Sequence, residues 1–181
     1  MRIISGKYKG RRFDPPKSFK ARPTTDFAKE NLFNVLNNTV DWEDTIALDL
    51  FGGTGGISFE LVSRGCPQVT CVEKNFNHAS FVEKTKEELK IKSELLLLKM
   101  DVFSYLERCR EQFDLIFADP PYDMKNFLDV PRIVFEKDLI KPGGIFILEH
   151  PKDYDFSGLP LFEEKRVYGS VNFSIFRKEL P

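Results

Sequence analysis

Short apolar runs alternate with longer amphipathic runs along most of this chain. Apolar segments of strand length are predicted at residues 45–51, 68–73, 95–99, 113–118 and 145–149. Helical patterns lie between them at residues 57–64, 76–90, 102–110 and 132–137. Because strands that alternate with helices form right-handed βαβ units, we expect an α/β fold: a mostly parallel sheet with helices on both faces.

The two ends of the chain depart from this alternation. Residues 161–168 and 171–178 are joined by Gly169 and Ser170 without a helix, which predicts an antiparallel pair and a total of seven strands. Residues 2–13 are expected to form a short hairpin, and a helix should begin after Thr25 and end at Asn37. We therefore expect an N-terminal extension at residues 1–24 and a main domain at residues 25–181.

Length and composition exclude several classes of protein. A chain of 181 residues can bury one core, and its longest apolar runs of about four residues fall far below the ~18 needed for a membrane span. No apolar stretch follows the first residues, so no secretory signal is expected. Cys66, Cys71 and Cys109 form no CxxC pair, and the chain holds only 2 histidines, so we expect no metal site. A reduced, cytoplasmic setting is the natural expectation.

The charge is distributed unevenly, although the formal net charge is only −1. Residues 1–25 hold eight basic residues against the single acid Asp14, whereas the rest of the chain holds 19 basic and 27 acidic residues. The eight are Arg2, Lys7, Lys9, Arg11, Arg12, Lys17, Lys20 and Arg22. Such a segment is typical of one that contacts nucleic-acid phosphates, and a solvated basic tail is the alternative.

A glycine-rich turn follows the first predicted strand. The segment from Asp49 to Gly55 reads Asp-Leu-Phe-Gly-Gly-Thr-Gly and leads into a helix, which places it at a ligand-binding edge of an α/β sheet. It lacks the Gly-Lys-Ser/Thr of a phosphate loop, and Ser58 departs from the dinucleotide pattern Gly-x-Gly-x-x-Gly. Since Asp49 would repel a pyrophosphate, the turn favours a cationic ligand over a dinucleotide, and a purely structural turn is the alternative.

Two further acids come at the ends of the next predicted strands. Glu73 ends the second strand, where a carboxylate can accept hydrogen bonds from ribose hydroxyls. Asp101 follows the third strand, where it can accept from an adenine amino group, cap the next helix, or do both. An ordinary exposed glutamate is the alternative for Glu73.

The segment Asp119-Pro120-Pro121-Tyr122 follows the fourth predicted strand. The two prolines fix the backbone and leave carbonyls that only accept hydrogen bonds, so Asp119 and the Pro120 carbonyl can together hold one amino group. Tyr122 offers a flat face on which a base can stack, and only this face is expected to be used. The motif therefore predicts chemistry on an exocyclic amine by positioning, and a rigid turn is the alternative.

Taken in this order, the motifs resemble the class I S-adenosylmethionine-dependent methyltransferases that modify exocyclic amines. More narrowly, the chain resembles the RsmD group, which methylates N2 of a guanine in 16S ribosomal RNA. The resemblance covers nearly the whole chain. It includes residues 2–12, the Arg-Pro-Thr segment at Arg22–Thr24, residues 60–65, and Tyr168-Gly169. Gly53 and Thr54 depart from the usual Ala-Ser, and Ser58 stands where glycine is frequent.

The resemblance implies a Rossmann-like fold, S-adenosylmethionine as cofactor, and a role for each motif. The methionine part of the cofactor would lie near Gly52–Gly55, Glu73 would hold the ribose, and Asp101 with the Val102 amide would contact adenine. The target guanine would lie over Tyr122. The implied cofactor set is Asp49, Phe51, Gly52, Gly53, Thr54, Gly55, Glu73, Lys74, Asp101 and Val102. The implied catalytic set is Asp119, Pro120, Pro121 and Tyr122, and the RNA-binding set is Arg2, Lys7, Arg11, Arg12, Arg22 and Thr24.

The implied partner is 16S ribosomal RNA or a small-subunit assembly intermediate, bound by a monomer away from any membrane. Three alternatives stay open at this point. The residues themselves do not separate guanine N2 from adenine N6 in DNA or RNA. A protein glutamine is a further amine target, although that activity usually goes with Asn-Pro-Pro-Tyr, which Asp119 contradicts. The third alternative is an RNA-binding module without catalytic activity.

Overall fold

The computed structural model describes residues 1–19 and 24–181. It contains a seven-stranded sheet in the order β3-β2-β1-β4-β5-β7-β6, in which β1 to β5 run parallel and β7 runs antiparallel to both of its neighbours. The strands are β1 (Ile46–Leu50), β2 (Gln68–Val72), β3 (Leu95–Leu98), β4 (Phe113–Ala118), β5 (Ile140–His150), β6 (Phe162–Tyr168) and β7 (Val171–Arg177). The predicted α/β fold with its antiparallel C-terminal pair is confirmed.

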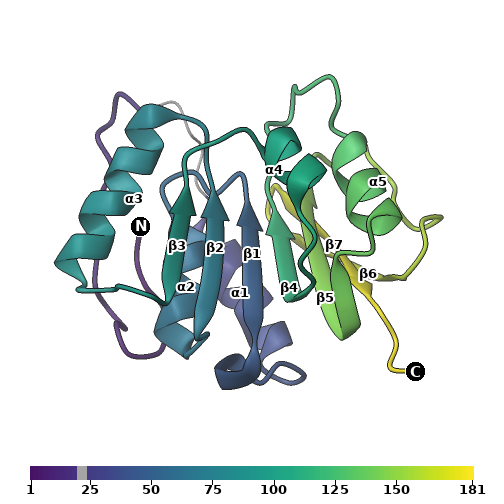
Figure 1. Cartoon of the computed structure of the whole chain (residues 1–181), viewed down its shortest axis with the longest axis horizontal. Coiled ribbons are helices and arrows are strands. Elements are labelled where there is room, and N and C mark those ends of the chain that lie inside the picture. The colour runs from purple at the N-terminus through teal and green to yellow at the C-terminus, as the bar shows by residue number, and fades with distance from the viewer. Residues whose placement is uncertain (20–23) are drawn as a thin grey trace.

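Helices cover both faces of the sheet (Figure 1). They are α1 (Asp26–Leu36), the short 3-10 helix η1 (Trp42–Asp44), α2 (Gly56–Arg64), α3 (Phe76–Glu88), α4 (Val102–Arg108) and α5 (Asp129–Glu136). One core cluster joins α1, α2 and α3 to alternate sheet residues such as Ala47 and Phe117. The other cluster joins α4 and α5 to the sheet residues that alternate with those of the first cluster, such as Leu48 and Ile116. This alternation is the two-residue period of a strand that is buried on both faces.

Polar side chains set where most helices begin. Thr25, Asn75 and Asp101 each accept hydrogen bonds from backbone amides in the first turn of α1, α3 and α4. Pro131 lies in the first turn of α5, where a missing N–H leaves no helical bond unmade. For this reason α5 begins at Asp129, three residues before the predicted start.

Strand β5 is longer than the sequence predicts. It begins at Ile140 and not at Ile145, and its pairing with β4 shifts register between Phe113 and Leu115. Gly143 and Gly144 lie at this irregularity, which broke the apolar pattern from which the strand was predicted.

The hairpin expected at residues 2–13 is reduced to one antiparallel bridge between Arg2 and Arg12, with turns at residues 5–10. The buried Glu60 of α2 anchors this segment to the main domain, because its carboxylate accepts from the amides of Ile4 at 2.8 Å and Ser5 at 3.1 Å. Lys29 and Arg64 form ion pairs with the same carboxylate. These side-chain contacts to α2 add to the backbone bonds between the two arms, which run from the Ile3 amide to the Arg11 carbonyl at 3.0 Å, from the Gly10 amide to the Ile3 carbonyl at 2.9 Å and from the Phe13 amide to the Met1 carbonyl at 2.9 Å.

Among the described residues, no helix is long and apolar enough to cross a membrane.

Candidate functional site

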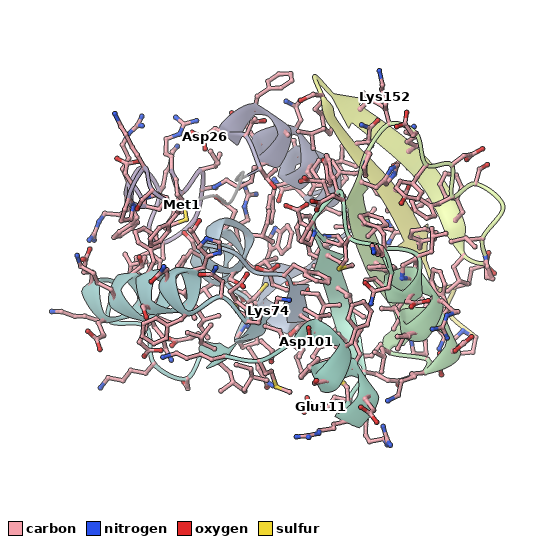
Figure 2. All side chains as sticks on the ribbon, turned by 90° about the horizontal axis from the view of Figure 1, so that it is seen from above. Met1, Asp26, Lys74, Asp101, Glu111 and Lys152 are labelled. Carbon is pink, nitrogen blue, oxygen red and sulfur yellow. The ribbon has the colours of Figure 1, made fainter. Side chains whose placement is uncertain are left out.

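A cavity of about 990 Å³ opens at the carboxyl ends of the parallel strands, where the order of the sheet reverses between β1 and β4. Figure 2 looks down on this end of the molecule, and four of the residues labelled there, Met1, Asp26, Lys74 and Asp101, line the cavity. The described lining comes from the ends of β1, β2, β4 and β5, from the start of β7, and from α1, α2, α3 and α4.

The register of the sheet brings three carboxylates to the same face. Asp49 of β1 pairs with Phe117 of β4, so Asp119, which comes two residues later and directly after β4, falls on the same side as Asp49. The last paired residues of β4 and β5 are Ala118 and Leu148, which makes Asp119 and Glu149 the next neighbours. All three carboxylates line the cavity.

Asp49 is only 1% exposed and accepts a hydrogen bond of 2.7 Å from the Ser58 hydroxyl of α2. Burial raises the pKa of Asp49 to about 7, although the bond from Ser58 acts in the opposite direction. A positive charge in the cavity would favour the ionised form of this carboxylate, which agrees with the cationic ligand expected from the sequence.

The glycine loop brings backbone to the cavity wall. Gly52, Gly53 and Thr54 line the cavity together with Phe51. A Cβ at Gly52 would overlap the Cys71 sulfur, so the chain can approach β2 this closely only with glycine. Gly55 lies behind the wall as the residue before α2, with a φ of 90°, so its part in the site is to form the turn.

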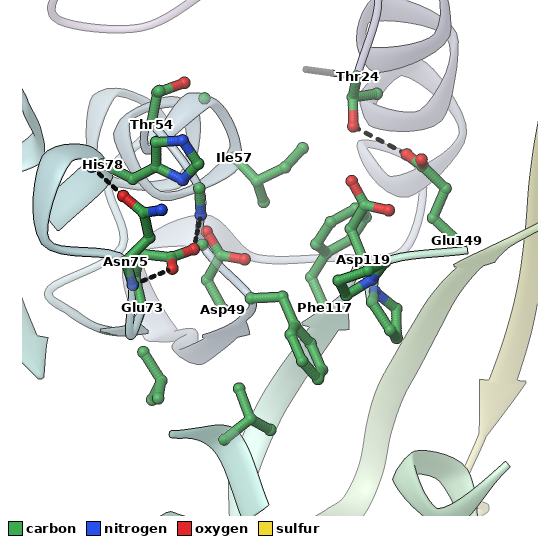
Figure 3. Close-up of a pocket in the computed structure, with 18 of the residues that line it drawn as sticks. Thr24, Asp49, Thr54, Ile57, Glu73, Asn75, His78, Phe117, Asp119 and Glu149 are labelled. Carbon is green, nitrogen blue, oxygen red and sulfur yellow. Dashed lines mark hydrogen bonds between the residues drawn. The ribbon is translucent and has the colours of Figure 1, made fainter. Parts of the chain in front are cut away.

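Glu73 ties the second strand to this loop. Its carboxylate accepts bonds of 2.8 Å from the amides of Gly53 and Asn75, both drawn in Figure 3. The neighbouring Lys74 is exposed at the rim of the cavity. The carboxylate is thus fixed from two sides at the place where the sequence predicted a ribose.

Asp101 and Val102 line the cavity at the start of α4. The Oδ2 atom of Asp101 accepts from the amides of Phe103 at 2.9 Å and Ser104 at 3.1 Å. Asp101 is therefore the helix cap that the sequence allowed. Because Oδ2 already accepts two hydrogen bonds, Oδ1 is the oxygen left to accept one from an adenine amino group.

The segment from Asp119 to Tyr122 lines the opposite end of the cavity. Burial holds the pKa of Asp119 well above its ordinary value, and the charge of the neighbouring Glu149 acts in the same direction. Glu149 also accepts from the Thr24 hydroxyl at 2.8 Å, drawn in Figure 3, and from the Tyr122 hydroxyl at 3.2 Å. Contrary to the sequence-based expectation, the Tyr122 hydroxyl has a partner, so the ring face is not the only part in use.

Among the residues that the structure describes, the cavity is lined by more carboxylates than cations. The basic side chains of this described lining are Lys29, which is buried and ion-paired with Glu60, and Lys74 and His78 at the edge. No group of three or more potential metal ligands occurs among the described residues. A polyphosphate would meet repulsion here, whereas a ligand with a positive centre and a nucleoside part fits the donors and acceptors present.

Comparison with known proteins decides the family. Residues 1–177 match the family described as conserved hypothetical protein 95. Ribosomal RNA small subunit methyltransferase D of Haemophilus influenzae is 31% identical over 156 residues, which cover 84% of this chain and 80% of that protein. The chain belongs to this methyltransferase family. The resemblance found in the sequence is confirmed.

Solved structures extend the match to the fold of the whole chain. A hypothetical protein of Thermus thermophilus superposes with a TM-score of 0.85 at 27% identity, covering 99% of each chain. The 16S rRNA N2 G1207 methyltransferase of Thermus thermophilus, solved with AdoMet and guanosine, superposes with a TM-score of 0.68 at 21% identity over 89% of this chain and 45% of that one. The second likeness concerns the fold alone and confirms the expected Rossmann-like methyltransferase architecture.

Glu149 is the residue of the site that sequence reasoning missed. It ends an apolar strand, just as Asp49 and Glu73 do, and this signal could have identified it. Its place beside Asp119 follows from the pairing of β4 with β5, which the sequence does not give.

The residues expected to bind RNA lie in different surroundings in the structure. Lys7, Arg11 and Arg12 are exposed on the N-terminal segment. Arg2 instead forms ion pairs with Asp26 at 3.4 Å and Glu30 at 4.0 Å on α1. Thr24 lines the cavity and contacts Glu149, and Arg22 lies outside the described residues.

Proposed function

We propose that this protein transfers a methyl group from S-adenosylmethionine to the exocyclic N2 amine of a guanine in 16S ribosomal RNA. The observation that carries the proposal is a row of fixed carboxylates at one edge of the sheet: Asp49 and Glu73 beside the glycine loop, and Asp119 on the Asp-Pro-Pro-Tyr segment. The named relative and the structure solved with AdoMet and guanosine support the same reading.

The chain offers the cofactor a separate contact for each of its parts. Bound S-adenosylmethionine supplies an electrophilic methyl group on a positively charged sulfur. Asp49 places a buried carboxylate near that charge, and Glu73 accepts from the ribose hydroxyls. The backbone of the loop leads into the N-terminus of α2, where amide groups favour a carboxylate such as that of the methionine part. Asp101 and Val102 contact the adenine, with Phe51 and Lys74 completing the wall.

The other half of the cavity holds the target base. Tyr122 is 39% exposed, so its ring can stack on a base while its hydroxyl stays on Glu149. Asp119 and the Pro120 carbonyl accept hydrogen bonds from the amine, which directs the nitrogen lone pair toward the methyl group. Pro121 keeps this backbone rigid. Positioning and preorganised charge then lower the barrier.

We assign residues 1–24 to an extension that binds RNA and residues 25–181 to the catalytic domain. Lys7, Arg11 and Arg12 contact phosphates, which adds affinity without reading sequence. Thr24 acts at the cavity through Glu149, so it belongs with the catalytic contacts. The substrate is 16S ribosomal RNA or a small-subunit assembly intermediate, met in the cytoplasm by a monomeric enzyme.

The test uses RNA from cells that lack this gene. The purified protein, with methyl-labelled S-adenosylmethionine, is given small ribosomal subunits, naked 16S RNA and duplex DNA from the deletion strain. We expect label on the subunits or on their RNA, released as N2-methylguanosine after digestion. Label on adenine N6 or on DNA would replace the proposed target. No transfer to any substrate, with no heat of cofactor binding, would leave a non-catalytic RNA-binding module.

A further inference from the structure

The pair Asp119 and Glu149 is the least ordinary feature of the cavity. Two carboxyl groups that come next in the register of neighbouring parallel strands lie on the same face and line the same cavity. Two ionised carboxylates placed side by side in a site that largely excludes water repel each other. One proton held by the pair relieves this repulsion in the substrate-free protein.

Glu149 is held in place by the rest of the site. It is 5% exposed, and one oxygen accepts from the Thr24 hydroxyl while the other accepts from the Tyr122 hydroxyl. Both donors are neutral, so neither cancels the charge of the pair. A second carboxyl that served only to fill space would need no such fixation, and an apolar side chain would avoid the cost of burial.

We propose that Glu149 is a positioning residue, which holds Asp119 through a shared proton and makes this carboxyl pair the acceptor of the proton that the target amine loses. This inference rests on the proposed function. It adds a residue and a proton path to the site, neither of which the Asp-Pro-Pro-Tyr motif contains.

Atoms and charges balance in the transfer. The lone pair of the amine nitrogen forms the bond to the methyl carbon, while the carbon–sulfur bond breaks and its electrons stay on sulfur. One N–H bond of the amine then breaks, its electrons stay on nitrogen, and the proton moves to the Asp119 oxygen. The cofactor loses one positive charge and the pair loses its one negative charge. The second proton leaves the pair to solvent when the product departs.

The elevated pKa of Asp119 agrees with this role, because burial and the neighbouring carboxyl both make it a better proton acceptor than an ordinary aspartate. Other charged or titratable groups also face the cavity from each element around the pair. Within residues 1–19 and 24–181 they are Asp49 on β1, Glu73 and Lys74 after β2, Asp26 and Lys29 on α1, His78 on α3, Asp101 before α4, and Tyr122 and Asp123 after β4. Asp49 is the one among them that also raises the pKa of Asp119 through its charge.

The experiment compares Glu149→Gln, Glu149→Asp and wild type in single-turnover methyl transfer to small subunits from the deletion strain, across a range of pH. Glutamine keeps the shape of the side chain but holds neither charge nor exchangeable carboxyl proton. Without the like charge, Asp119 ionises at lower pH, so the acidic limb of the rate profile should move downward by about one pH unit. Near neutral pH the rate should fall about 10- to 100-fold, since Asp119 becomes a weaker base. Glu149→Asp should restore part of the rate and the original limb.

Glu136→Gln makes the same chemical change at an exposed position on α5 outside the cavity and should behave as wild type. Affinity of each variant for S-adenosylmethionine should stay within about twofold of wild type, which shows that the site is folded. A Glu149→Gln enzyme with lower rate but an unmoved acidic limb, or with a normal rate, would overturn the inference. A wild-type enzyme that labels no ribosomal substrate would instead overturn the proposed function.

Discussion

The carboxylate of Glu73 accepts a hydrogen bond of 2.8 Å from the backbone amide of Gly53, so the tip of the second strand holds the glycine loop that follows the first. A contact of this kind makes one residue serve two purposes. It fixes the shape of the loop, and its remaining acceptor capacity faces the cavity, where we propose that the cofactor ribose binds.

Glu73→Ala should therefore weaken cofactor binding more than the loss of one ribose contact would. Losing a charged hydrogen-bond partner costs about 1.5–3 kcal/mol, so we expect affinity for S-adenosylmethionine to fall by about 10- to 100-fold in calorimetry. Affinity for RNA should hardly change. Glu88→Ala, at an exposed position at the end of α3, is the matched control. Equal losses of cofactor and RNA binding would indicate misfolding and would remove the assignment.

Cofactor affinity should depend on pH through Asp49. This carboxyl has a pKa of about 7 in the ligand-free protein because it is buried, and a bound sulfonium stabilises its ionised form. Binding below about pH 7 therefore releases a proton, and affinity should rise with pH by up to about tenfold per unit before levelling off above 7. Calorimetry at a series of pH values measures this slope. Asp49→Asn, or the uncharged thioether product used as ligand, should give a much flatter profile. A profile equally steep for both ligands would show that Asp49 does not face the positive charge.

Asp119→Ala should separate chemistry from binding. The carboxylate orients the amine and its contact strengthens as positive charge develops on nitrogen, so kcat should fall by about 10²–10³. Affinity for S-adenosylmethionine should change little, because the proposed cofactor contacts lie on β1, after β2 and at the start of α4. Turnover that stayed near normal would mean that the Asp-Pro-Pro-Tyr segment is a rigid turn.

Tyr122 offers two variants with different expected results. Tyr122→Ala should weaken capture of the target base by about 1–3 kcal/mol because the stacking surface is removed, which appears as a higher KM for RNA. Tyr122→Phe keeps the ring but removes the bond to Glu149, which is worth about 0.5–1.5 kcal/mol. We expect it to lower kcat by about 2- to 10-fold with KM nearly unchanged. A fully silent Tyr122→Phe would indicate that only the ring face matters.

Salt dependence tests the basic extension. Replacing Lys7, Arg11 and Arg12 with glutamine should flatten the slope of log affinity against log salt by about 0.7–0.9 for each phosphate that the protein no longer neutralises. Arg2→Gln is the informative comparison, because Arg2 is ion-paired with Asp26 and should contribute less to the slope. If the triple variant kept the wild-type slope, these residues would be an ordinary solvated surface.

The sequence by itself determined the α/β class, the glycine loop and the acids that end its strands. Each of these follows from local rules: periodicity sets strands and helices, Glu73 and Asp119 follow apolar runs of strand length, and Asp49 lies near the end of another. The antiparallel C-terminal pair was also predictable, because Gly169 and Ser170 leave no room for a crossover helix.

Only the tertiary structure decided which of these residues meet. Glu149 becomes part of the site because β5 pairs with β4 in a register that sets it beside Asp119. The two strands are far apart in sequence, and no local sequence pattern indicates which of their residues pair. Arg2 and Thr24 were assigned to RNA from charge and motif, yet folding places one against α1 and the other against Glu149. The N-terminal segment keeps one antiparallel bridge between Arg2 and Arg12, but the amides of Ile4 and Ser5 find their partner in the buried Glu60, which lies 56 and 55 residues away in sequence.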